Sequence, residues 1–246
     1  MLKKLGIPVM GYYAIMAISL IFLKVLWGRD YQSEDFNHYF LPFMGLLSLW
    51  TGYWIHKNDS RLALVNKGAR KPARGGGFYL VLMVLCLLSI WAIWDSLLAG
   101  KWVSLGVLIL DAVLIGLAEE GMFRYYLLGQ VQDHLSKRKA VIVSACLFAF
   151  LHVFNLIGNM SLDQVANQLV TTLIMGAFLA AAYLVTGKIG PIILFHALWD
   201  FLIFSDLASQ VSWLILFMLS LLPIQALLAL YYYVKLGDDR ARSWHQ

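Results

Sequence analysis

The feature that most constrains this chain is a series of apolar segments, each long enough to cross a lipid bilayer. A helix needs about 20 predominantly apolar residues to cross ~30 Å of hydrocarbon. The chain has 246 residues, 61% hydrophobic and 13% charged, and its mean hydropathy is +0.74. These values lie outside the usual range of soluble globular domains. The sequence therefore predicts an all-α, polytopic integral membrane bundle of eight helices, with spans at residues 5–27, 39–55, 78–98, 102–131, 141–157, 166–186, 189–205 and 211–235.

The connections between these spans are short, and no Gly/Ser-rich or Pro-rich linker is long enough to separate two domains. We therefore expect residues 1–246 to form one integral membrane domain, with a motif-bearing core at about 102–205. The two cysteines, Cys86 and Cys146, fall inside predicted spans, where they act as small apolar residues rather than as a disulfide framework.

The distribution of basic residues predicts the orientation of the bundle. The segment 56–77 is rich in Lys and Arg, as are residues 137–139 and the C-terminal tail, whereas residues 28–38 are acidic. The positive-inside rule assigns the basic connections to the cytoplasm. Eight spans then leave both termini cytoplasmic. The short loops and compact size are typical of a bacterial plasma membrane protein, and the net charge of +5 gives no support to nucleic-acid binding.

A small set of ionisable residues lies inside the predicted spans. Such groups are costly in hydrocarbon, so they normally face a protein interior or a water-filled cavity and carry function. We expect some of them to share a polar site. The set consists of Asp95, Asp111, Glu119, Glu120, Arg124, His152, His196 and Asp200.

Helix geometry predicts which of these groups meet. Glu120 and Arg124 are four residues apart and can form an ion pair, while Glu119 is turned by about 100° and is free to contact another span. At 1.5 Å per residue, Glu119, His152 and Asp200 lie ~16 to 18 Å from the cytoplasmic ends of their spans, and His196 lies at ~10 Å. The sequence thus predicts one cavity between the fourth, fifth and seventh spans, which we expect to open toward the cytoplasmic half.

Such a cavity fits hydrolytic chemistry. A carboxylate beside an imidazole can take a proton from water, and a second imidazole can hold a carbonyl oxygen as it gains negative charge. Ser144 and Cys146 share a span with His152 but lie off its helix face, which favours water as the nucleophile. Zinc is the alternative, because one Glu and two His are a ligand set that zinc uses in hydrolases, here Glu119, His152 and His196.

Three motifs in this region carry a resemblance. The stretch "EEGMFR" matches Glu-Glu-x-x-x-Arg, "FAFLH" matches Phe-x-x-x-His, and "HALWD" matches His-x-x-x-Asn/Asp. In this order they are similar to the motifs of the CPBP family, also called the Abi or CAAX-protease-related family, which consists of intramembrane endopeptidases. The resemblance covers residues 119–200.

The resemblance implies a role for each motif residue. Glu119 and His152 would activate water, and His196 with Asp200 would stabilise the oxyanion. Position 200 is Asn in the prenyl-protein-processing branch, so Asp200 must be protonated, orient His196 or bind metal. The residues expected to support the site are Glu120, Arg124 and Phe148.

The resemblance also bears on substrate and cofactor. It implies a peptide or membrane-protein substrate in the lipid bilayer, in peptide or protein maturation or bacteriocin self-immunity, with prenylated substrates the less expected choice. It leaves the zinc question and the oligomeric state open. Two alternatives remain from the residues alone: a proton-coupled transporter, which also uses intramembrane carboxylates and histidines, and a non-catalytic scaffold or immunity protein.

Overall fold

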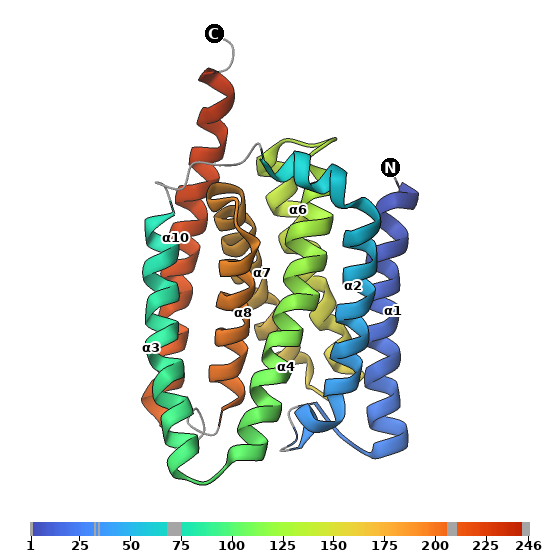
Figure 1. The fold of residues 1–246 in the computed structure, drawn as a ribbon, viewed down its shortest axis with the longest axis vertical. Helices are drawn as coiled ribbons and strands as arrows, with labels where there is room; N and C mark the ends of the chain where they lie inside the picture. The colour runs from blue at the N-terminus through green and yellow to red at the C-terminus, as the bar shows by residue number, and fades with distance from the viewer. Residues whose placement is uncertain (1, 32, 34, 68–74, 206–210, 243–246) are drawn as a thin grey trace.

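The computed structural model describes residues 2–31, 33, 35–67, 75–205 and 211–242, and it contains helices without strands in these residues. Its long helices alternate in direction along the bundle axis (Figure 1). They are α1 Leu2–Trp27, α2 Phe36–Lys67, α3 Gly76–Leu98, α4 Trp102–Glu120, the π-helix η2 Gly121–Leu127, α5 Leu128–Val131, α6 Lys137–Leu151, the 3-10 helix η3 His152–Leu156, α7 Leu162–Thr186, α8 Ile189–Phe204 and α10 Ser212–Arg242. The prediction of an all-helical polytopic bundle is confirmed.

Each of the eight predicted spans falls on described helix. Among the described residues, six helical segments are long and apolar enough to cross a membrane: Gly6–Trp27, Gly76–Leu98, Trp102–Val131, Lys137–Leu156, Leu162–Thr186 and Trp213–Leu236. The other two predicted spans, 39–55 and 189–205, lie in α2 and α8. The second of these helices has only 16 residues, which is ~24 Å of helix.

The start of α1 and the end of α10 lie at the same end of the bundle, together with the connection between α5 and α6 (Figure 1). This arrangement agrees with an even number of membrane crossings. The assignment of that end to the cytoplasm stays a prediction. Part of its support, the basic residues Arg70, Lys71 and Arg74, lies outside the described residues.

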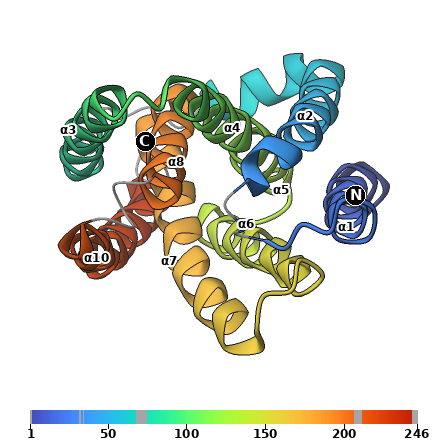
Figure 2. The same cartoon turned by 90° about the horizontal axis from the view of Figure 1, so that it is seen from below.

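The fourth predicted span packs between two other helices. When the bundle is viewed along its axis, α4 lies between α2 and α8, and α7 lies between α6 and α10 (Figure 2). Small residues allow the closest approaches, as is common where helices pack in lipid. A Cβ added at Gly116 of α4 would lie 2.9 Å from the carbonyl oxygen of Ile193 in α8, and one at Gly176 of α7 would lie 3.3 Å from Cα of Ala145 in α6. The first of these contacts brings α8 close to the end of α4 that carries the two glutamates.

Candidate active site

α4 ends with two adjacent glutamates, Glu119 and Glu120, and the helix changes its winding directly after them. Residues 121–127 form a π-helix, in which backbone bonds run to the fifth residue rather than the fourth and which often marks functional sites. Two hydroxyl groups donate to carbonyl oxygens around this segment: Thr51 Oγ1 to Ala118 at 3.1 Å and Ser144 Oγ to Phe123 at 2.9 Å. In lipid, such side-chain partners satisfy backbone groups that irregular winding leaves free.

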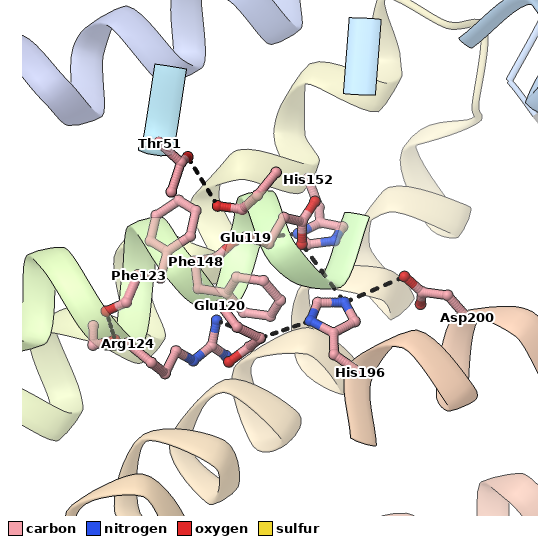
Figure 3. Close-up of polar contacts among 11 residues, drawn as sticks. Thr51, Glu119, Glu120, Phe123, Arg124, Phe148, His152, His196 and Asp200 are labelled. Atoms are coloured by element: carbon pink, nitrogen blue, oxygen red, sulfur yellow. Dashed lines mark hydrogen bonds and ion pairs between the residues drawn. The ribbon is translucent and has the colours of Figure 1, made fainter. Parts of the chain in front are cut away.

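His196 is the centre of the polar cluster, with carboxylates at both ring nitrogens (Figure 3). Its Nδ1 lies 2.6 Å from Oε1 of Glu120, and a carboxylate only accepts, so Nδ1 donates this hydrogen bond. Its Nε2 lies 3.3 Å from Oδ2 of Asp200 and 3.7 Å from Oε2 of Glu119. The structure therefore confirms that Glu119 reaches another span, and it places Asp200 where it can orient His196.

The predicted pair of Glu120 and Arg124 is also confirmed. Nη1 of Arg124 lies 3.0 Å from Oε1 of Glu120, and both side chains are fully buried. The guanidinium lies over the ring of Phe148, with Cζ 3.9 Å from the ring centroid, a cation–π arrangement. Glu120 thus has a second partner that helix spacing alone does not predict, because its Oε1 also accepts from His196.

His152 begins the 3-10 helix η3 directly after α6. Its Nδ1 lies 3.2 Å from the carbonyl oxygen of Phe148, so Nδ1 carries the proton of the neutral ring and Nε2 is left as the acceptor. The ring is half-buried and lines the same cavity as Glu119. Phe148 holds both histidines by edge contacts, with ring centroids 5.2 Å from His152 and 5.7 Å from His196. This packing role matches the expectation for Phe148.

All four residues assigned to catalysis line one cavity of about 420 Å³: Glu119, His152, His196 and Asp200. Its outer walls include Tyr31 from the α1–α2 connection, Asn37 at the start of α2 and Met160 from the connection before α7. The cavity therefore opens at the end of the bundle opposite the predicted cytoplasmic end. The expectation of an opening toward the cytoplasmic half is therefore not met if that end is cytoplasmic, and the cytoplasmic assignment itself stays a prediction.

The reason lies in the packing beneath the glutamates. Toward the predicted cytoplasmic end, Phe123, Arg124 and Phe148 are each 0% exposed, so the stacked guanidinium and rings leave no path for water. At the open end, Tyr31 reaches the cavity. Burial raises the pKa of the Tyr31 phenol above its ordinary value, and the nearby Asp200 carboxylate raises it further by a smaller amount. The phenol therefore stays protonated.

A row of neutral polar side chains lines the cavity along α7 and was not predicted. It consists of Gln164, Asn167, Gln168 and Thr171, which we call the α7 polar row. Nδ2 of Asn155, a buried residue of η3, donates to Oε1 of Gln168 at 2.8 Å. The i, i+3, i+4, i+7 spacing of the row is visible in the sequence as one face of a helix, and this signal could have identified it.

The remaining candidates from the sequence lie elsewhere. Asp95 and Asp111 do not line the cavity, and Asp111 is buried within α4. Cys146 is exposed, and Ser144 is engaged with a backbone carbonyl. The expectation that neither Ser144 nor Cys146 is the nucleophile is consistent with these positions.

The zinc alternative needs three ligating side chains close together. Within the described part of the chain, no three side chains of His, Cys, Asp or Glu are grouped so that they could hold a metal ion. The set Glu119, His152 and His196 lines one cavity but does not form such a group. Zinc binding by these three residues stays a prediction.

Comparison with known proteins identifies the motif-bearing segment. Residues 101–202 match the family model described as Rce1-like, type II CAAX prenyl endopeptidase. The matched segment contains all three motifs and confirms the resemblance. Searches of curated proteins and of solved structures give no match.

Proposed function

We propose, since residues 101–202 of this chain belong to the CPBP family of CAAX-related proteases, that the protein is an intramembrane endopeptidase that hydrolyses a peptide bond with water activated by Glu119. One observation carries this proposal. The Glu119 carboxylate is only 4% exposed, yet it faces a cavity that it shares with His152, His196 and Asp200. A buried carboxylate is retained at such a position when it has a chemical task.

The geometry suggests how each residue acts. The Glu119 carboxylate takes a proton from water, and the water oxygen forms a bond to the carbonyl carbon of the substrate. Nε2 of His152, the acceptor nitrogen of its ring, helps to orient that water. The carbonyl oxygen becomes an oxyanion, and Nε2 of His196 lies where a protonated nitrogen would hydrogen-bond it. The carbon–nitrogen bond then breaks, and the proton held by Glu119 passes to the leaving nitrogen.

Residues behind His196 fix its position. Glu120 accepts a hydrogen bond from Nδ1 and is itself held by Arg124. Asp200 contacts Nε2 from the same helix. The bond from Nδ1 keeps the ring in one orientation, and the Asp200 carboxylate beside Nε2 favours a proton on that nitrogen. This proton is then available to the developing charge without reorganisation of the ring. Glu120 and Arg124 are therefore positioning residues in this proposal, and Asp200 orients His196.

The test compares purified Glu119→Gln with wild type in detergent micelles. Glutamine keeps the size and polarity of the side chain but cannot accept the proton, so cleavage of candidate peptides should fall by about 10²-fold or more while the melting temperature is retained. Cys146→Ser is the matched control, because Cys146 is exposed and does not line the cavity. Retained cleavage by a folded Glu119→Gln protein would rule out the assignment.

The substrate is proposed as a peptide or membrane protein, in peptide maturation or bacteriocin self-immunity. The same variant addresses a scaffold or immunity role without catalysis. A scaffold would keep its cellular phenotype when Glu119 is replaced by Gln, whereas a protease would lose it.

A further inference from the structure

We propose that the α7 polar row is a subsite for the main chain of an uncharged, unwound peptide segment, which enters the cavity from the non-cytoplasmic end of the bundle. The proposal rests on the proposed function and names how that site takes its substrate. The starting observation is that α7 combines an apolar composition with a row of polar side chains. α7 is long and apolar enough to span a membrane, yet its first half presents Gln164, Asn167, Gln168 and Thr171 to the cavity rather than apolar side chains.

The row has the dimensions of a short stretch of extended peptide. Residues 164 and 171 are separated by ~10 Å along the helix axis, at 1.5 Å per residue. An extended chain rises about 3.3 Å per residue, so the row matches roughly three residues of substrate. Three members already have partners. Gln168 Oε1 accepts from Asn155, which is only 4% exposed, Gln164 Oε1 accepts from the Ser161 N–H, and Thr171 Oγ1 donates to the Gln168 carbonyl oxygen. Asn167 is exposed and lines the cavity, so its amide is accessible to a ligand.

The chemistry of the row fits a peptide backbone. A peptide bond must leave its helix to be cleaved, and each N–H and C=O group it frees at membrane depth is costly unless it finds a partner. Carboxamide side chains supply both a donor and an acceptor, so they can meet either backbone group. Such hydrogen bonds to the backbone can form whatever side chains the substrate carries.

The absence of charge on this wall selects against charged substrates. Of the described residues that line the cavity, those with ionisable side chains are the four assigned to catalysis and Tyr31. No Lys or Arg among them could neutralise a substrate carboxylate, and a buried unpaired charge is strongly disfavoured. A substrate Lys or Arg would compete with His196 for the carboxylates of Glu119 and Asp200. A segment with uncharged residues on both sides of the cut site is therefore the substrate that the cavity accepts.

The direction of entry follows from where the cavity opens. Its rim is formed by the α1–α2 connection and the connection before α7, which are joined by a hydrogen bond from the Tyr31 N–H to the Gly158 carbonyl at 2.7 Å. A second bond runs from Asn159 Nδ2 to Asp30 Oδ2 at 3.2 Å. These connections hold one basic residue, Arg29, which pairs with Asp35. The other basic connections are concentrated at the opposite end of the bundle, and the positive-inside rule assigns the rim to the non-cytoplasmic side.

A labelling experiment tests the entry route without requiring cleavage. In full-length protein with Cys86→Ser and Cys146→Ser, Asn167→Cys and Lys139→Cys are each exposed to a membrane-impermeant maleimide, in right-side-out and inside-out vesicles. Lys139 is exposed near the start of α6, at the opposite end of the bundle. Asn167→Cys should be labelled from the non-cytoplasmic side and Lys139→Cys from the cytoplasmic side. Labelling of both from one side, or no labelling of Asn167→Cys, would overturn this route.

A kinetic experiment tests the main-chain subsite. With an internally quenched peptide of uncharged residues, Asn167→Leu should raise KM by about fivefold, the worth of one hydrogen bond, with kcat unchanged. Asn167→Gln keeps the amide and should restore KM. An unchanged KM in Asn167→Leu overturns the subsite. Failure of the proposed function is a different result, namely cleavage by Glu119→Gln or none by wild type. In that case binding of the same peptide, read by fluorescence anisotropy, decides the subsite by the same comparison.

Discussion

The distance between α4 and α8 should be set by Gly116, and Gly116→Ala is the substitution that tests this. A Cβ at this position would lie 2.9 Å from the Ile193 carbonyl oxygen and 3.3 Å from the Ala197 backbone nitrogen. Ordinary contact begins at 3.4 Å, so the shorter of these distances must increase by about 0.5 Å. Both neighbours are backbone atoms and cannot rotate away. The two helices must therefore move apart.

Two opposing effects determine the loss of stability. Overpacking a close contact costs about 1 to 3 kcal/mol, while replacing Gly by Ala inside a helix stabilises by about 0.5 to 1 kcal/mol. The free energy of unfolding should thus fall by about 1 kcal/mol. The effect on activity is larger, because His196 lies on α8 close to this contact, and a misplacement of ~1 Å can cost about 10²-fold in rate. A shift of half that size should lower kcat/KM by roughly tenfold.

Gly106→Ala is the matched control on the same helix, because no atom lies within 4 Å of a Cβ added there. It should raise stability by about 0.5 to 1 kcal/mol and leave activity unchanged. Thermal melting in detergent micelles and peptide cleavage measure both effects. If Gly116→Ala melts and cleaves like Gly106→Ala, then Gly116 does not set the distance between the helices, and our account of how α8 reaches the glutamates fails.

Two further predictions concern the charges. Glu120→Gln leaves the buried Arg124 guanidinium without its carboxylate, which should lower stability by about 3 to 5 kcal/mol, and a melting temperature equal to that of wild type would contradict the pairing. Treatment with EDTA or phenanthroline should leave peptide cleavage unchanged, since the described side chains form no group that could hold a metal. Loss of cleavage that added Zn²⁺ restores would instead support a zinc site at Glu119, His152 and His196.

The helices were predictable because the bilayer thickness fixes the length of an apolar segment. All eight predicted spans fall on described helices. The meeting of Glu119, His196 and Asp200 was predictable for a related reason. α-Helical spacing gives both the depth and the face of a residue, and α4 keeps regular winding as far as Glu120.

What the sequence did not predict depends on contacts between distant segments. Hydroxyl groups from α2 and α6 donate to backbone carbonyls around the π-helix that begins at Gly121. No local sequence pattern predicts this π-helix. The rise per residue along each helix places the catalytic groups at one depth in the membrane. It does not predict on which side the cavity is closed. That side is decided by the stacking of Arg124 on Phe148. The α7 polar row was overlooked because average hydropathy conceals a narrow polar face.

The ion pair within α4 and η2 also bears on how this protein enters the membrane during synthesis. Each charged residue at the centre of an inserting helix adds about 2.5 to 3.5 kcal/mol to the cost of transfer from the translocon. Glu120 and Arg124 lie in one continuous helical segment, so they can neutralise each other before any neighbouring helix arrives. The segment then carries two uncompensated acids, Asp111 and Glu119, into the bilayer, and Glu119 finds its imidazole partner only after α8 has been inserted.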